Sequence, residues 1–182
     1  MHRHRESFTK EQFERRMEYG EEVLGNYYSK YINSFNRIVA IERNIRNVVV
    51  KGVPIKGKID KLEFDGKSVN VVDYKTGDPD KAIPKCKGPS EKEPLGGDYW
   101  RQAVFYKILV DNYEQKNWKV VSTEFDFIEP DKKKNYKKEK LVKDIDESMD
   151  ELRAMAKKVS LSGAIRHTAF GDITKLELVH FV

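Results

Sequence analysis

The chain has 182 residues, of which 36% are charged and 38% apolar, a balance typical of a globular domain with one core and a solvated surface. The formal net charge of +5 permits a polyanionic partner without requiring one. No apolar run approaches the roughly 20 residues of a membrane span, and the N-terminal stretch lacks the apolar segment of a secretory signal. The single cysteine excludes intrachain disulfides. We therefore expect one domain over residues 1–182, in a reducing cytoplasm and with no membrane partner.

Residues 9–33 are predicted to form the first helix, because Thr9 suits an N-cap and apolar or aromatic residues recur at helical spacing. Residues 38–50 are rich in β-branched side chains, which predicts a strand. The segment 54–77 is predicted to be a hairpin, with a turn signal at Asp65-Gly66 between its two strands. We thus expect a helix followed by three strands.

Residues 78–97 contain four of the six prolines and three glycines, which predicts a long exposed loop. A helix over 98–115, capped by Asp98, is expected to follow it. The next strand is predicted over 118–128, where Val121, Thr123, Phe125 and Phe127 alternate with polar neighbours.

The run "DKKKNYKKEK" over 131–140 is predicted to be a basic connecting loop. Residues 141–159 have the apolar spacing of a last amphipathic helix. The tail over 163–182 is ambiguous, with a strand near 176–181 as one interpretation. The chain contains no internal repeat and no P-loop motif.

Two carboxylates and one ammonium are expected to meet on the hairpin. A turn at Gly66-Lys67 places Asp60 directly opposite Asp73, and a turn at Asp65-Gly66 places them diagonally on the same face. The two-residue period of a strand puts Lys75 on that face as well. Neighbouring carboxylates repel unless a cation lies between them, and oxygen ligands suit Mg²⁺ or Mn²⁺. The alternative is an ordinary cross-strand Asp–Lys pair on a surface hairpin.

The following helix contributes two polar side chains to the same region. Gln102 and Tyr106 are i, i+4 neighbours, so both can reach one site. An amide and a phenol are natural donors to a phosphate or a metal-bound water. The alternative is that Tyr106 packs in the core with Gln102 at its edge. Before Asp60, Gly57 allows a close backbone approach, and Gly77 ends the strand just after the lysine.

The segment "GKIDKLEFDGKSVNVVDYKTG", followed by "RQAVFY", resembles the PD-(D/E)XK nuclease superfamily. The likeness is greatest to the RecB-like nuclease domains at the C-termini of UvrD/Rep-type helicases and to their stand-alone relatives. Their pattern reads G-x-(I/V)-D on one strand, D-Y-K-T-G closing the next, and Q-x-x-x-Y on a helix. All three pieces occur here in order, and the resemblance covers roughly residues 8–128. It implies an α/β fold with a restriction-endonuclease-like core, a mixed central sheet flanked by helices.

The resemblance also implies roles for these residues. Asp60, Asp73 and the backbone carbonyl of Tyr74 would bind Mg²⁺ or Mn²⁺. Lys75 would assist the attacking water, and the Gln102–Tyr106 pair would contact DNA or support the site. The implied activity is metal-dependent, exonuclease-like hydrolysis of DNA, on single strands or duplex ends, during repair or recombination. A helicase in the same or another chain is an implied partner, and the chain is then expected to be an excised domain of a larger protein.

Two departures from the family pattern keep other functions open. Many RecB-like domains carry a metal-binding histidine on the first helix, but here Leu24 stands in that place after Gly20. Glu22 is the acid that could substitute, while Glu42 is expected to form a surface salt bridge. The C-terminal cysteines that bind iron–sulfur in some relatives are absent. A degenerate module that binds DNA or a helicase without cleavage is therefore the second hypothesis, and a nuclease acting on RNA is the third.

The basic run offers further contacts to nucleic acid. Its lysines can contact phosphates, with salt-dependent affinity, and Tyr136 can stack on a base. The lysines concerned are Lys132, Lys133, Lys134, Lys137 and Lys138. The alternative is a solvated loop whose charges serve solubility.

Overall fold

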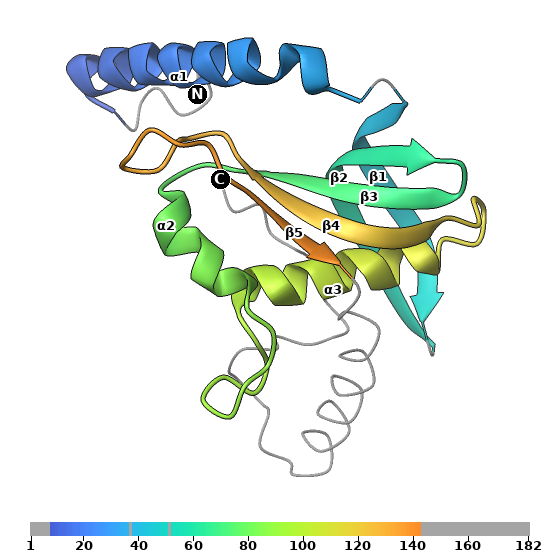
Figure 1. Ribbon diagram of the computed structural model, residues 1–182. Coiled ribbons are helices and arrows are strands. Elements are labelled where there is room, and N and C mark those ends of the chain that lie inside the picture. Colours follow the sequence, from blue (N-terminus) through green and yellow to red (C-terminus); the bar gives the residue numbers. More distant parts are fainter. Residues whose placement is uncertain (1–7, 37, 51, 143–182) are drawn as a thin grey trace.

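The computed structural model describes residues 8–36, 38–50 and 52–142 of the chain. Ten elements follow one another, and Figure 1 shows them along the chain. They are α1 (Lys10–Tyr31), η2 (Ile32–Ser34), β1 (Val39–Val50), β2 (Val53–Asp65), β3 (Ser68–Lys75), α2 (Pro79–Ala82), η3 (Ile83–Cys86), α3 (Asp98–Asp111), β4 (Lys119–Phe127) and β5 (Lys138–Val142).

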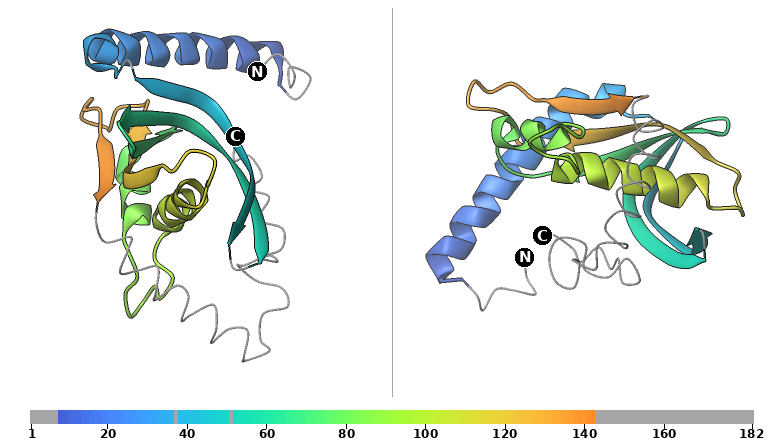
Figure 2. Two further views of the ribbon diagram at one scale, coloured as in Figure 1. Left: turned by 90° about the vertical axis from the view of Figure 1, so that its right-hand side faces the viewer. Right: turned by 90° about the horizontal axis from the view of Figure 1, so that it is seen from below.

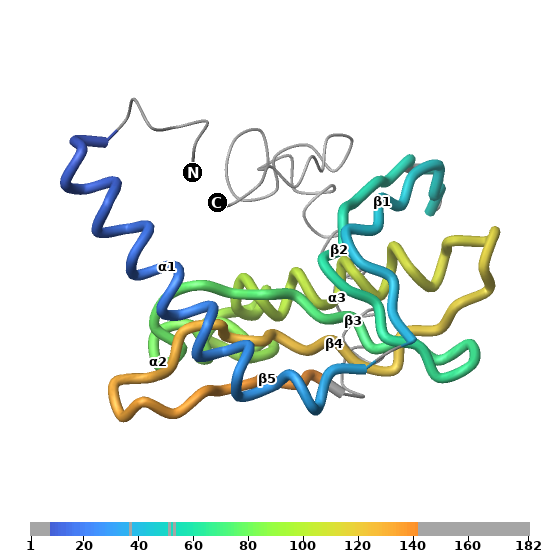
Figure 3. The backbone as a smooth tube through the Cα atoms, turned by 90° about the horizontal axis from the view of Figure 1, so that it is seen from above, coloured from blue at the N-terminus to red at the C-terminus, as the bar shows by residue number. Residues whose placement is uncertain are grey.

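The five strands form one mixed sheet in the order β1-β2-β3-β4-β5. Neighbouring strands are antiparallel except β3 and β4, which are parallel and joined by the crossover through α3. Helix α3 packs inside the curve of the sheet, while α1 lies outside it (Figure 2). Seen from above, α1 crosses over β3, β4 and β5 (Figure 3). The predicted α/β class, with a mixed sheet between helices, is confirmed.

The first helix begins as predicted. Thr9 is its N-cap, and the Thr9 hydroxyl accepts the backbone N–H of Gln12 while the Gln12 side chain accepts the Thr9 N–H. This reciprocal pair satisfies two amides that a helix start leaves without partners. Within the described ranges, none of the helices combines the length and apolarity needed to cross a membrane.

The two faces of the sheet differ in chemistry. The face toward α3 is apolar and contains the main core, in which Leu109 and Val110 pack against strand residues. Those strand residues are Ile45, Val48, Ile59, Leu62, Val69, Val71 and Val120. The face toward α1 is polar, and there the buried Tyr27 hydroxyl donates to Asp126 Oδ2 at 2.5 Å. Helix α1 is thus attached to the sheet by aromatic and charged side chains.

Gly57 lies where β2 packs closely against α3. A Cβ added there would lie 2.6 Å from Leu109 Cδ2 and 3.3 Å from Phe105 Cε1, and Leu109 is fully buried. We expect Gly57→Ala to lower the free energy of unfolding by about 1–3 kcal/mol, because the added methyl overpacks the core. Urea denaturation followed by circular dichroism measures this change.

Gly25→Ala on α1 is the matched control, because a Cβ at Gly25 meets nothing within 4 Å. It should leave stability unchanged or raise it by up to about 1 kcal/mol through helix propensity. An equal urea midpoint for Gly57→Ala and the wild type would contradict a close-packing role for Gly57.

Several predicted boundaries after the hairpin are wrong. Residues 78–97 were expected to form a loop, but they begin with α2 and η3, because Asp78 caps the first turn and Pro79 suits its start. The N-cap of α3 is Gly97, not Asp98. Helix α3 ends at Asp111 instead of residue 115, since the Asp111 carboxylate accepts the Val120 N–H at 2.7 Å and ties the helix end to β4.

The basic run is also divided differently. Lys138–Lys140 lie in β5 and not in a loop, because Lys138 pairs with Glu124 at 3.2 Å and Asp126 at 2.5 Å on the neighbouring β4. Residues 141 and 142, predicted as helix, complete β5, and residues 143–159 lie outside the described residues. The predicted alternation of β4 fails at Val121, which is 52% exposed, because an extra residue between two β3 pairings makes a bulge there.

Candidate active site

The hairpin register brings the two predicted carboxylates together. Strands β2 and β3 pair from Asp65↔Ser68 to Lys61↔Val72 around a two-residue turn, Gly66-Lys67. The next pair in this register is Asp60 opposite Asp73. Here the backbone ladder stops, and Asp60 Oδ2 accepts the Tyr74 N–H at 3.0 Å. The Asp60 carboxylate therefore holds the two strands together at the point where they separate.

Asp73 is the centre of a side-chain cluster under α3. It is only 4% exposed, and its Oδ1 accepts the Tyr106 hydroxyl at 2.5 Å and Gln102 Nε2 at 3.3 Å. Its Oδ2 lies 2.7 Å from Lys75 Nζ as an ion pair. We refer to Asp73, Lys75, Gln102 and Tyr106 as the Asp73 cluster.

Lys75 is held from several sides. Its Nζ donates to Gln102 Oε1 at 2.8 Å and lies 4.6 Å from the centre of the Tyr99 ring and 5.5 Å from that of Phe125. Gln102 also donates to the Tyr106 hydroxyl at 2.8 Å, so its amide links every member of the Asp73 cluster. These contacts fix the ammonium beside the buried carboxylate.

Burial dominates the protonation chemistry of the cluster. It raises the pKa of the Asp73 carboxyl, against the lowering effects of Lys75 and Tyr106, and the charge of Asp60 adds to the rise. Burial, followed by the Asp73 charge, raises the pKa of the Tyr106 hydroxyl, which therefore stays protonated and donates. A further cation between Asp60 and Asp73 would stabilise both charges.

The donor set fits a hard divalent metal ion. Asp73 Oδ2 is buried and ion-paired but receives no hydrogen bond of good geometry, so it keeps lone-pair capacity. Among the described residues, no group of three or more His, Cys, Asp or Glu side chains could hold a metal. Glu22 is exposed on α1 and does not join Asp60 and Asp73. Two carboxylates completed by backbone oxygen and water are the type of site that Mg²⁺ accepts.

Two other residues of the N-terminal part also lie apart from the cluster. Leu24, which stands in the place of the expected histidine, is 56% exposed on α1 and faces solvent. Glu42 on β1 is exposed and forms a surface ion pair with Lys58, which confirms the prediction for Glu42.

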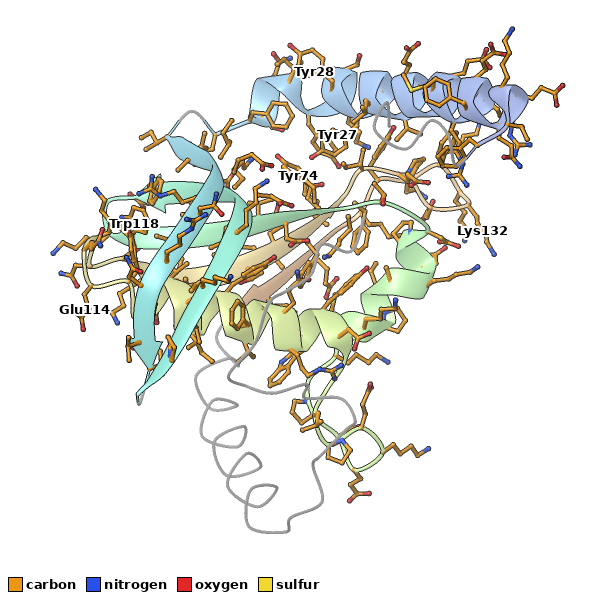
Figure 4. All side chains as sticks on the ribbon, turned by 180° about the vertical axis from the view of Figure 1, so that it is seen from behind. Tyr27, Tyr28, Tyr74, Glu114, Trp118 and Lys132 are labelled. Carbon is orange, nitrogen blue, oxygen red and sulfur yellow. The ribbon has the colours of Figure 1, made fainter. Side chains whose placement is uncertain are left out.

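The residues of the basic run that were predicted to contact nucleic acid differ from one another in their surroundings. Lys132, Lys133 and Lys134 are exposed, and Figure 4 shows Lys132 at the opposite end of the molecule from Glu114 and Trp118. Lys137 is ion-paired with Asp80 at 2.5 Å and Asp131 at 3.2 Å.

Tyr136 is half-buried in the interface with α1. Its ring contacts those of Tyr27 and Tyr31, and Lys30 Nζ lies 4.9 Å from its centre. Tyr27 points from α1 toward Tyr74 in Figure 4, and the two rings meet edge to face. The exposed lysines are therefore free to meet a polyanion, while Tyr136 is engaged within the protein.

Two residues near the site were not predicted from the sequence. Tyr99, under the Lys75 ammonium, lies three residues before Gln102, so helical spacing could have identified it. Glu129 Oε1 accepts the Gly77 N–H at 2.5 Å just after the lysine. No local pattern marks Glu129, because its position depends on the parallel pairing of β3 with β4.

Similarity to known proteins shows the family of this chain. A model of the PD-(D/E)XK nuclease superfamily matches residues 2–175. A search of curated proteins found no match. The crystal structure of SSO0001 is similar at 19% identity and a TM-score of 0.41, over 81% of this chain and 61% of that one. The chain thus spans less than two-thirds of the SSO0001 chain. On the family match over nearly its whole length, the chain belongs to the PD-(D/E)XK nuclease superfamily.

Proposed function

We propose that the protein is a metal-dependent nuclease that hydrolyses phosphodiester bonds in DNA. The observation that carries this proposal is the Asp73–Lys75 ion pair, in which Asp73 is buried and Lys75 half-buried, with Asp60 next in register opposite Asp73 across the hairpin. A fully exposed Asp–Lys pair would be solvated and would contribute little to the stability of the fold. This pair is partly buried and is hydrogen-bonded by a glutamine and a tyrosine, which is typical of a site built for chemistry.

Each residue of the Asp73 cluster has a role in this reaction. Asp60, Asp73 and the Tyr74 carbonyl would hold a divalent ion, which when bound supplies a nucleophilic hydroxide and neutralises charge on the phosphate. Tyr106 occupies Asp73 Oδ1 and thereby leaves Oδ2 directed at cations. The Lys75 ammonium has three donors, of which Gln102 takes one, while a second side of the ammonium faces Asp73 as an ion pair. The remaining donor can stabilise charge developing on a phosphate oxygen.

The exposed lysines of the basic run would bind the substrate strand. Lys137 ties this loop to Asp80 in α2, which begins four residues after Lys75, so Lys132–Lys134 lie on the side of the molecule where β3 ends. We expect the triple change Lys132→Ala, Lys133→Ala and Lys134→Ala to raise KM with kcat unchanged. The slope of log KM against log salt concentration should become smaller by about 0.7–0.9 for each phosphate contact removed. Cleavage rates over a potassium chloride series measure this.

The control is the triple alanine variant of three exposed lysines where β3 and β4 begin, at the other end of the strands: Lys67, Lys116 and Lys119. It removes the same charge and should leave KM and the salt slope as in the wild type. Equal effects of both triple variants would mean that net charge, and not the loop, governs substrate binding.

The direct test is cleavage of end-labelled single- and double-stranded DNA with Mg²⁺, Mn²⁺ or excess EDTA. We expect metal-dependent products, and a ladder that shortens from one end would support RecB-like exonuclease action in repair or recombination. Competition by unlabelled RNA separates an RNase from a DNase. DNA binding without cleavage under any metal would instead favour the degenerate module that serves DNA or a helicase, for which the exposed Leu24 is the main argument.

A further inference from the structure

The turn that follows Lys75 is held from outside the Asp73 cluster by one carboxylate. Glu129, two residues after the end of β4, is half-buried. Its Oε1 accepts the Gly77 N–H at 2.5 Å, and its Oε2 accepts the Tyr19 hydroxyl at 2.5 Å. A single side chain thus joins α1, the end of the β3 strand and the connection between β4 and β5.

The backbone of this turn depends on that carboxylate. The Lys75 carbonyl accepts the Ile128 N–H at 2.9 Å, at the end of β3 where its parallel ladder with β4 finishes. Two residues later Gly77 has a φ of +93°, a conformation that favours glycine. The Gly77 N–H therefore points away from the strand ladder and is satisfied by Glu129.

In both bonds the acceptor is a carboxylate oxygen of Glu129, a type of hydrogen bond stronger than one between neutral groups. The hydrogen bond to Glu129, with burial and the Glu129 charge behind it, raises the pKa of Tyr19 to about 12. The Tyr19 hydroxyl is therefore protonated at neutral pH and donates to Glu129. Tyr19 is 52% exposed, so its hydrogen bond to Glu129 lies at the surface of the α1 interface.

We propose that Glu129 is a positioning residue, which holds the Lys75–Gly77 turn through the Gly77 N–H and so places the Lys75 ammonium against Asp73 for phosphodiester cleavage. This inference rests on the proposed nuclease function. The competing explanation is that Glu129 merely fastens α1 to the sheet through Tyr19. The two explanations differ in which hydrogen bond of the carboxylate matters, the one to the Gly77 N–H or the one to the Tyr19 hydroxyl.

Three substitutions separate the effects of these two hydrogen bonds. Glu129→Ala removes both bonds, and Glu129→Gln keeps an oxygen that can accept the Gly77 N–H. Tyr19→Phe removes only the hydrogen bond from α1. We expect Glu129→Ala to lower kcat about 10- to 100-fold with KM unchanged, as expected when a catalytic group is displaced without loss of binding. Glu129→Gln should recover most of the rate, and Tyr19→Phe should cut DNA like the wild type.

Amide hydrogen exchange, followed by NMR, provides a readout that does not depend on activity. In Glu129→Ala the Gly77 amide should lose protection by about tenfold or more, as expected for a lost hydrogen bond worth about 1.4 kcal/mol or more. The amides of Val71 and Val72 in the middle of β3 should exchange as in the wild type. Tyr19→Phe should leave the Gly77 amide protected.

Three results would overturn the proposal. Unchanged Gly77 protection in Glu129→Ala would show that Glu129 does not hold the turn. Lost protection with an unchanged kcat would show that the turn does not position Lys75, and a Tyr19→Phe variant as slow as Glu129→Ala would assign the effect to α1 docking. If the wild type cuts no DNA with any metal, the nuclease function fails, while the exchange measurement still decides whether Glu129 holds the turn.

Discussion

Replacing Lys75 with alanine should slow metal-dependent DNA cleavage by about 100- to 1,000-fold, the range found when one donor to a developing negative charge is removed. The ammonium is fixed by an ion pair at 2.7 Å to Asp73 and a hydrogen bond at 2.8 Å to Gln102, so water cannot take its place with the same geometry. Because binding to the phosphate backbone is spread over other lysines, KM should change much less than kcat. Steady-state cleavage of an end-labelled oligonucleotide measures both.

Lys107→Ala is the matched control for this experiment. The Lys107 side chain is 13% exposed and that of Lys75 is 17% exposed, and each forms an ion pair with an aspartate, Asp111 at 3.1 Å in the case of Lys107. Loss of a partly buried ion pair should therefore affect the stability of both variants to a similar degree. Only Lys75→Ala should lose activity once the protein is folded. Equal cleavage by Lys75→Ala and Lys107→Ala would remove Lys75 from the mechanism.

The hairpin shows how far local patterns can predict this site. Period two along β2 and β3, with a two-residue turn, was enough to place Asp60, Asp73 and Lys75 on one face, and the turn formed is Gly66-Lys67. The i, i+4 spacing similarly predicted that Gln102 and Tyr106 meet, and they do so at 2.8 Å. Both interpretations of Tyr106 hold in part, since its ring belongs to the core while its hydroxyl binds Asp73.

Features that depend on pairing between distant segments were not predictable in this way. The lysines of 131–140 look alike in sequence, but Lys138 enters β5 because Asp126 and Glu124 face it from β4. Lys137 turns back to Asp80, about 57 residues earlier in the chain, and the resulting contact fixes the loop. Glu129 belongs to the same class, because it reaches Gly77 only through the parallel pairing of β4 with β3, two strands that the crossover through α3 separates in the chain.

Asp73→Asn should abolish both cleavage and the stabilisation of the protein by Mg²⁺, with little change in the stability of the metal-free protein. The amide keeps an oxygen for the Tyr106 hydroxyl and has the size of the carboxylate. Removing the charge removes the desolvation cost that raises the pKa of Asp73, but it also takes the counter-charge from Lys75, and these effects on folding oppose each other.

Thermal unfolding with and without Mg²⁺ separates the metal from the fold. At a concentration 100 times its Kd, a ligand stabilises the native state by about 2.7 kcal/mol, so the wild type should melt at a clearly higher temperature when Mg²⁺ is present. Asp73→Asn should show no such shift, whereas Asp111→Asn, which changes an ion-paired aspartate outside the Asp73 cluster, should keep it. A full Mg²⁺ shift in Asp73→Asn would mean that the metal lies elsewhere. The Asp73–Lys75 pair would then stabilise the structure only, and the chain would be better explained as a module that binds nucleic acid without cutting it.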